Sequence, residues 1–240
     1  MSRSKDAPFT EAPEIPVIAA GEGWLVVDKP CGISVHNDPG RDLCSIVGRA
    51  AGPVPRKLHP VNRLDRETSG VMILCSDPAA FRFMAAQFES GSVAKRYVAL
   101  LHGRLEPAHE ATGASYWDWP LADDGGGRRF PQGRGVPRVC RTRWRVGGFS
   151  RHFTRVDCEP ESGRRHQIRR HAALAGHPVV GDRRYGSPGA LAVVRRRFGF
   201  ARLALHAVAL SVVPPGERQA VEFCSGGIPA QIERLFGEDV

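Results

Sequence analysis

The chain has 240 residues, of which 42% are hydrophobic and 25% are charged. These are globular proportions, and the length allows one substantial core or at most two small ones. Lysine and arginine number 34 against 25 acidic residues, and this net charge of +9 predicts a polyanionic partner, either nucleic acid or an acidic membrane surface.

Cysteine usage and the N-terminal residues exclude secreted and membrane-spanning classes. The six cysteines are widely spaced, contain no CxxC pair and show no paired Cys/His spacing of a zinc site. Residues 1–17 lack the apolar core of a signal peptide, and no run is long enough to span a membrane. We therefore expect a cytoplasmic protein with reduced thiols and no bound metal. We also expect a monomer, which rests on none of these features.

The N-terminal quarter begins with a flexible tail at residues 1–14, rich in charge, serine and proline. An apolar run, WLVVD at 24–28, predicts a strand, and the Lys-Pro-Cys-Gly turn at 29–32 ends it. Residues 37–57 form a connection with glycine and proline, in which a short helix is expected near Leu43–Ala50.

The most informative stretch is residues 58–76, LHPVNRLDRETSGVMILCS. Its apolar end, 71–75, predicts a buried strand. Four of the five residues at 63–67 are charged, and a tight polar turn follows at 68–70. A charged loop on a core strand is how a scaffold presents a reactive group, here Asp65, although a solvated turn has the same local pattern.

A helix and a strand follow this loop. Asp77 and Pro78 form an N-cap and a first-turn proline, and Gly91 ends the helix. Apolar residues recur at helical spacing at Phe81, Met84, Ala85 and Phe88. This stripe favours a core face over a base-stacking surface. The next strand is expected at 93–101.

Residues 125–156 contain nine arginines and no acidic residue. Within them, the alternation at 140–146 predicts a strand with one apolar and one basic face, the latter formed by Arg141, Arg143 and Arg145. Solvated faces normally mix signs, so uncompensated arginines favour phosphate contact. The preceding 125–137 loop is predicted to be mobile and able to order on RNA.

The last informative segment is residues 162–186, SGRRHQIRRHAALAGHPVVGDRRYG. Periodicity predicts a helix over 165–175 with several arginines in its N-terminal half. Cations there oppose the helix dipole, so an anion is expected nearby, either RNA phosphate or a buried carboxylate. A final strand is expected at 203–213.

Several of these segments together resemble the RluA-type pseudouridine synthases. The similarity lies in RLDRETSG at 63–70, in Lys-Pro-x-Gly at 29–32, in Lys-Arg-Tyr at 95–97, and in the two halves of the 162–186 block. The resemblance implies an α+β fold, with a mixed, mostly antiparallel sheet flanked by helices. It also implies a single catalytic domain at 15–240 and no additional RNA-binding domain of the S4 type.

The resemblance further implies the activity and the site. Such enzymes isomerise uridine in ribosomal or transfer RNA without cofactor or metal. Asp65 corresponds to the catalytic aspartate, Arg169 to its ion-pair partner, and Tyr97 to the residue that packs on the flipped base. Together with the charge pattern, it predicts substrate contacts from Arg63, Arg141, Arg143, Arg164, Arg165 and Leu205. Taken singly, Tyr97 is also compatible with a core role, and Arg63 with a simple phosphate contact.

One residue departs from the family pattern, and two other functions remain as alternatives. Asn62 stands where the family usually has histidine, which we interpret as a tolerated structural change, with reduced or altered activity as the other outcome. A glycosidase needs two separated carboxylates, and Glu67 is the only acidic residue close to Asp65 in the sequence. A catalytically impaired RNA-binding protein would share the same basic charge.

Overall fold

The computed structural model describes residues 13–50, 57–106 and 114–240, so the predicted tail at 1–14 lies almost entirely outside the described residues. The strands are β1 (Val17–Gly21), β2 (Trp24–Lys29), β3 (His59–Pro60), β4 (Ser69–Cys75), β5 (Ala94–His102), β6 (Ala114–Trp117), β7 (Leu121–Ala122), β8 (Pro137–Arg138), β9 (Thr142–Phe149), β10 (Phe153–Pro160), β11 (Leu205–Val212) and β12 (Val221–Cys224). The helices are α1 (Leu43–Ala50), α2 (Pro78–Glu89), α3 (Gln167–Leu174), α4 (Pro188–Phe198) and α5 (Ala230–Glu238).

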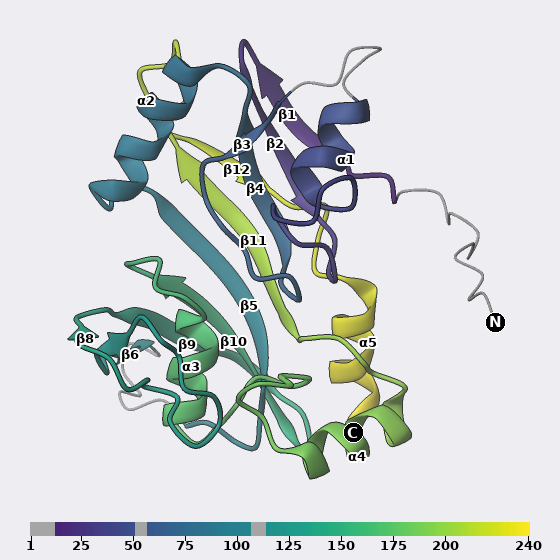
Figure 1. The fold of residues 1–240 in the computed structure, drawn as a ribbon. Helices are drawn as coiled ribbons and strands as arrows, with labels where there is room; N and C mark the ends of the chain where they lie inside the picture. Colours follow the sequence, from purple (N-terminus) through teal and green to yellow (C-terminus); the bar gives the residue numbers. More distant parts are fainter. Residues whose placement is uncertain (1–12, 51–56, 107–113) are drawn as a thin grey trace, which may run out of the picture.

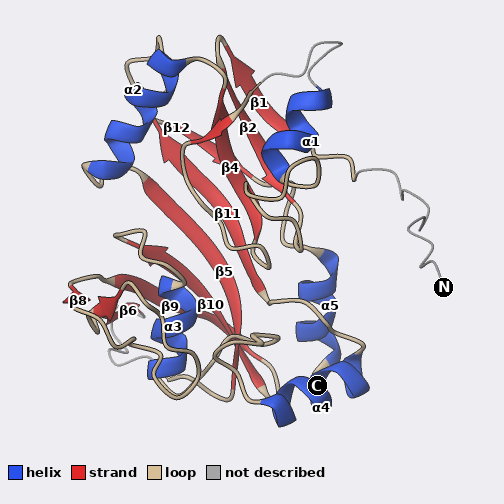
Figure 2. Ribbon diagram, viewed as in Figure 1, coloured by secondary structure: helices blue, strands red, loops and turns tan. Residues whose placement is uncertain are grey.

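Ten strands form one mixed sheet, and eight of them follow one another in the order β1-β2-β4-β11-β5-β10-β9-β6. The other two pair outside this order, β3 with β4 and β12 with β11. The strand pairings are antiparallel except for the parallel pair β4–β11. In Figures 1 and 2, α1 and α2 lie at one end of this sheet, whereas α3, α4 and α5 lie toward the other. The predicted α+β fold with a mostly antiparallel sheet and flanking helices is confirmed.

The parallel pair joins the strand after the Asp65 loop to a strand from the C-terminal part of the chain. Ser69 pairs with His206 and Gly70 with Ala207. Gly70 has a φ of +120°, and a Cβ there would lie 2.1 Å from the carbonyl oxygen of Ala207. Only glycine fits this close approach of two backbones.

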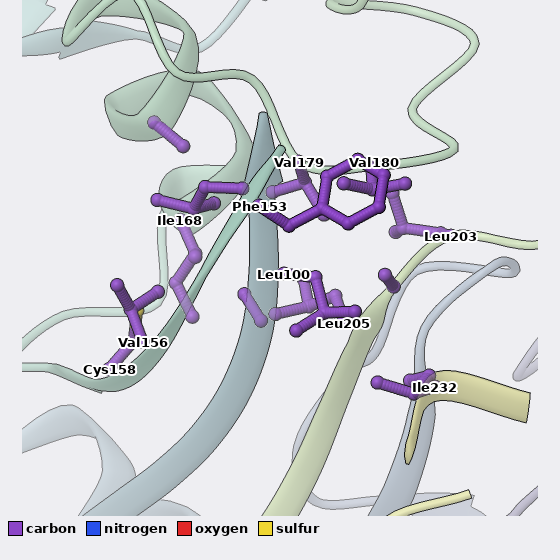
Figure 3. Close-up of a cluster of buried hydrophobic side chains, with 14 of the residues drawn as sticks. Leu100, Phe153, Val156, Cys158, Ile168, Val179, Val180, Leu203, Leu205 and Ile232 are labelled. Atoms are coloured by element: carbon purple, nitrogen blue, oxygen red, sulfur yellow. The ribbon is translucent and has the colours of Figure 1, made fainter. Parts of the chain in front are cut away.

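Three hydrophobic clusters form the core, and the largest lies between the sheet and α3 and α5 (Figure 3). Ile168 of α3, Leu100 of β5 and Leu205 of β11 meet in it. The predicted apolar stripe of α2 packs in a second cluster, where Met84 is fully buried. Its assignment to the core is therefore confirmed, as is the N-cap, because the Asp77 carboxylate accepts the Ala80 amide at 2.7 Å.

The predicted helix at 165–175 starts two residues late, at Gln167. His166 has a left-handed φ of 56°, which interrupts the helical path before Gln167. Arg164 and Arg165 consequently lie in the preceding loop, so their placement in the helical N-terminal half was wrong. The strands expected at 24–28, 93–101 and 203–213 and the helix at 43–50 are confirmed within two residues.

The expectation of an uncompensated basic face on β9 is wrong, because the register with β10 places acidic residues opposite the arginines. Arg143 pairs with Glu159 at 3.0 Å. Arg141 pairs with Glu161 at the same distance. The ion pair of Arg145 with Asp157 is longer, 3.5 Å. Since all six side chains are substantially exposed, each pair stabilises little but neutralises the local charge.

The 125–137 loop was predicted to be mobile, but in the structure it is anchored to the body of the protein. Arg170, fully buried, donates to the carbonyl oxygens of Ala122, Pro131 and Gln132. The Asp124 carboxylate accepts the backbone amides of residues 134 and 135. These bonds satisfy a buried guanidinium, so the loop and α3 depend on each other.

A histidine at the β4–β11 junction makes stability depend on pH. His206 Nδ1 lies 2.8 Å from the Ser69 hydroxyl and Nε2 lies 2.9 Å from that of Ser225. Burial, reinforced by the charge of Arg202, lowers the pKa of His206 to about 4. The unfolded chain then binds more protons than the folded chain between that value and the ordinary histidine pKa, near 6.5.

We therefore predict that the free energy of unfolding falls as the pH is lowered from about 6.5 to about 4, by at most about 1.4 kcal/mol per pH unit for this group. Denaturant titrations of the wild type and of His206→Asn at several pH values measure it. The variant should show a shallower dependence over this range. Identical slopes would mean that His206 is not held neutral by the fold.

Candidate active site

The loop that carries Asp65 is fixed at both ends to the sheet. Leu64 is buried in the third core cluster, beside the Asp65 backbone. The Thr68 amide donates to the Asp65 carbonyl at 3.0 Å and closes a turn at 65–68. The turn predicted at 68–70 was therefore placed too late, because Ser69 and Gly70 already belong to β4. Asn62 Oδ1 accepts the amide of Ile73 at 2.9 Å, which ties the start of the loop to β4. The structural interpretation of Asn62 is thus supported, whereas its effect on activity stays a prediction.

The Lys-Pro-Cys-Gly turn at 29–32 holds the same loop through hydrogen bonds to Arg66. Lys29 is fully buried, and its Nζ donates to the carbonyl oxygens of Pro30, Ile33 and Arg66 at 2.9 to 3.2 Å. Arg66 in turn donates to the Gly32 carbonyl at 2.9 Å. Burial lowers the pKa of Lys29 to about 8. The sequence showed this turn, but not that its lysine would hold the loop.

Arg169 of α3 joins the loop to the rest of the site. Its Nη1 donates to Asp65 Oδ2 at 2.9 Å, and its Nε and Nη2 donate to both oxygens of Asp182 at 2.7 and 2.9 Å. Burial alone would lower the pKa of Arg169. The hydrogen bonds and negative charge of Asp182, and to a smaller extent those of Asp65, outweigh burial and raise this pKa above its ordinary value. The predicted ion pair between Asp65 and Arg169 is confirmed, and the anion expected near this helix is a buried carboxylate.

Asp182 was missed in the sequence, although it closes the Gly-His-Pro-x-x-Gly-Asp block. It is only 1% exposed and also accepts the backbone amides of Arg184 and Tyr185. Four donors therefore surround one carboxylate, as a buried charge requires. The detectable signal was an acidic residue directly after a glycine and before two arginines.

His166 faces the second oxygen of Asp65. Its Nε2 lies 3.5 Å from Asp65 Oδ1, and its Nδ1 lies 2.9 Å from the hydroxyl of Tyr185. Burial, reinforced by neighbouring arginines, lowers the pKa of His166 to about 4, so the imidazole is neutral near pH 7. Both oxygens of Asp65 thus have a fixed neighbour, one charged and one neutral.

These groups line an open pocket of about 400 Å³. Besides Asp65, seven predicted or newly found site residues line it: Arg63, Tyr97, Arg164, Arg165, His166, Arg169 and Leu205. Tyr97 is half-buried between two core clusters. Burial and then the charge of Asp65 raise the pKa of its hydroxyl, which therefore stays protonated. A single carboxylate meets several cations, a setting suited to an anionic ligand.

The part of the sequence that supplies most of the pocket residues matches a known protein family. The family model described as RNA pseudouridylate synthase matches residues 23–174.

The chain belongs to the RNA pseudouridylate synthase family.

Curated relatives place it within the RluA-type branch predicted from the motifs. The Yersinia pestis protein named ribosomal large subunit pseudouridine synthase C is 36% identical over 210 residues, covering 82% of this chain and 62% of the relative. The Escherichia coli K12 protein of the same name is 35% identical over 194 residues, covering 80% and 60%. The chain thus spans less than two thirds of the length of these relatives.

Solved structures agree on the synthase fold. Human RNA pseudouridylate synthase domain containing 1 superposes with a TM-score of 0.73 at 24% identity, covering 92% of this chain and 86% of the other. Human RNA pseudouridylate synthase domain containing 4 gives a TM-score of 0.71 at 21% identity, covering 92% of both chains. At these identities the likeness shows the fold.

Some sequence predictions lie outside the synthase pocket. Arg141 and Arg143 are not among its lining residues, and their role in binding RNA stays a prediction. Among the described residues, no group of histidine, cysteine or acidic side chains could hold a metal ion. In the same part of the chain, no helix combines the length and apolar character needed to span a bilayer.

The glycosidase alternative requires a second carboxylate in the pocket. Of the described residues that line it, Asp65 is the only acidic one. Glu67 lies on the other side of the loop, where its backbone carbonyl accepts from the Cys31 thiol at 3.0 Å. The arrangement of two carboxylates flanking one bond is therefore absent from this pocket as described.

We predict that Asp182→Asn lowers the free energy of unfolding by about 3 kcal/mol, because the buried Arg169 loses one of its two charged partners. Denaturant titration measures it. Glu222→Gln, which removes the exposed partner of Arg96, is the matched control and should cost under about 1 kcal/mol. Equal effects of the two variants would show that Asp182 does not support Arg169.

Proposed function

We propose that this protein is an RNA pseudouridine synthase that isomerises uridine in ribosomal RNA, with Asp65 as the catalytic carboxylate. The observation that carries the proposal is the contact of Asp65 with Arg169 at 2.9 Å on the wall of a pocket with a cationic rim. The names of the curated relatives favour large-subunit ribosomal RNA. Transfer RNA is the other substrate class that the motifs allow.

The reaction explains why one carboxylate is enough. Isomerisation breaks the bond from the sugar to N1 of uracil and forms a bond from the same carbon to C5. N1 gains a proton and C5 loses one, so substrate and product contain the same atoms. No oxidant or co-substrate is needed, in agreement with the expectation of a cofactor-free enzyme. A carboxylate beside the sugar carbon can attack it or stabilise its developing positive charge.

The neighbours of Asp65 assist this chemistry by holding it in one place. The guanidinium of Arg169 pairs with one oxygen of the partly buried carboxylate at 2.9 Å and fixes its position. The neutral imidazole of His166 limits movement of the other oxygen without adding a second positive charge. Such preorganisation removes the need to reorient groups during the reaction.

The apolar walls of the pocket suit an extruded base. Chemistry on a base requires that it leave the stack, and flipped bases are commonly held against aromatic or apolar side chains. Tyr97 and Leu205 provide such surfaces beside Asp65. Arg63 is exposed at the pocket rim, two residues before Asp65, where it can enter the space that the uridine leaves. Arg164 and Arg165 are placed to contact phosphates.

We further propose that residues 15–240 act as one catalytic domain and that the protein works as a monomer in the cytoplasm. The ten-stranded sheet links segments from both halves of the chain, which supports a single domain. All six cysteines are free thiols, as expected in a reducing compartment. The impaired RNA-binding alternative gains no support, because Asp65, Tyr97 and Arg169 are intact and line the same pocket.

We predict that Asp65→Asn abolishes pseudouridine formation and leaves RNA affinity within about twofold of the wild type. The substitution preserves shape but removes the charge, whereas affinity comes mainly from phosphate contacts elsewhere. Both proteins are incubated with an unmodified transcript of large-subunit ribosomal RNA, and its nucleosides are separated by chromatography and mass spectrometry. Binding is measured by filter retention at fixed salt.

Glu217→Gln, an exposed carboxylate in the turn between β11 and β12, is the charge-matched control and should retain full activity. A chelator should leave the wild type active. Wild-type turnover by Asp65→Asn would show that the wrong residue has been assigned. Absence of pseudouridine with the wild type on ribosomal and transfer RNA alike would refute the proposed function.

A further inference from the structure

A second basic surface lies outside the pocket, on and around α4. Residues 183–216 contain six arginines and no acidic residue. Three of these arginines line one surface groove, Arg183, Arg195 and Arg196. All three are exposed. The groove also contains the apolar residues Leu191, Val194 and Phe200. We call these six residues the α4 groove.

The charge of the α4 groove is not compensated. Among the described residues, no carboxylate lies within 4.0 Å of the three guanidinium groups, in contrast to the paired arginines of β9. The only side-chain hydrogen bond that they make within the described residues is a long one, 3.5 Å, from Arg183 to the Ala201 carbonyl. An exposed surface that mixes both signs needs no partner, whereas a cluster of one sign favours an anionic ligand.

The α4 groove is connected to the pocket through the Asp182 segment. Asp182 holds Arg169 inside the site, and the next residue, Arg183, lines the groove. Arg184 follows, and its charge acts on His166 together with that of Arg165. Arginines therefore stand at the pocket rim, at Arg165, and in the segment that leads from Asp182 to the α4 groove, at Arg183 and Arg184. In Figure 1, α4 lies toward the same end of the sheet as α3, whereas α2 lies at the opposite end.

We propose that the α4 groove binds the phosphate backbone of the RNA strand that flanks the nucleotide in the pocket. This inference rests on the proposed function, because a uridine in the pocket belongs to a chain that must leave it in both directions. Arginine suits phosphate, since its planar guanidinium donates two parallel hydrogen bonds. Val194 and Phe200 are buried beneath the groove and Leu191 is only partly exposed, so the arginines supply the contacts that we assign to phosphate.

The test compares two double variants that lose the same charge. Arg195→Gln with Arg196→Gln removes two cations from the α4 groove. Arg82→Gln with Arg218→Gln removes two exposed arginines from α2 and the β11–β12 turn, and neither has a carboxylate partner among the described residues. Binding to an unmodified transcript of large-subunit ribosomal RNA is measured over a range of salt concentrations. Turnover is measured on the same RNA, and thermal unfolding checks that both variants fold.

The α4 variant should bind roughly tenfold more weakly at moderate salt, and its log–log salt slope should fall by about 1.5, the value for two lost phosphate contacts. Turnover at saturating RNA should be unchanged while KM rises. The distant control should change the slope by less than half as much. Equal changes in the two variants, or none in the α4 variant, would overturn the proposal.

Binding of the same variants to vesicles containing phosphatidylglycerol tests the alternative that the α4 groove contacts a membrane surface. Loss of vesicle binding with unchanged RNA binding would assign the α4 groove to a membrane surface and also overturn the proposal. Failure of the α4 groove proposal can be distinguished from failure of the proposed function. If the wild type forms no pseudouridine, that function fails. If it does form pseudouridine while the α4 variant binds RNA normally, only the α4 groove is rejected.

Discussion

A guanidinium buried between two carboxylates is the constraint on which the site depends. Arg169 is 6% exposed, and a cation at such a position is tolerated only when its charge and its donors are matched. Asp182 takes two of those donors, and Asp65, 104 residues away in the sequence, takes another. The position of α3 therefore determines where the carboxylate of the loop can lie. The negative charge of Asp65, to which we assign the catalytic role, is also what holds its loop to α3.

The sheet supplies the rigid base for this ion pair. The parallel contact of β4 with β11 places Ser69 beside His206, and Arg202 donates to the same serine hydroxyl. Lys29 ties the loop to its own turn, because it donates to the Arg66 carbonyl of the loop and to the Pro30 and Ile33 carbonyls of the turn. Each of these buried polar groups has partners from segments distant in the sequence, so the loop cannot move without leaving several of them unpaired. A site built in this way is preorganised before any RNA arrives.

Local patterns predicted α1, α2 and α3 and the strands β2, β4, β5, β9 and β11, because apolar periodicity reports which face is buried. The other described elements, among them β10, α4 and α5, were not predicted. The pairing of Asp65 with Arg169 followed only from the resemblance of two distant motifs, since no local rule joins them. Strand register was not accessible, so the arginines of β9 looked unpaired although Glu159 and its neighbours lie opposite them. The left-handed turn at His166 and the anchoring of a loop by Arg170 also depend on tertiary contacts that single-sequence patterns do not encode.

The most direct test of the account follows the hydrogen on C5 of uridine. Purified protein is incubated with ribosomal RNA transcribed with uridine tritiated at C5, and tritium in water is compared with pseudouridine in the digest. If the proposed isomerisation takes place, one tritium is released for each pseudouridine formed and no free uracil appears, because the glycosidic bond passes from N1 to C5 while the base is retained. Release of uracil that still carries its tritium would instead identify a hydrolase. RNA that is bound but keeps all its tritium would contradict catalysis by this site.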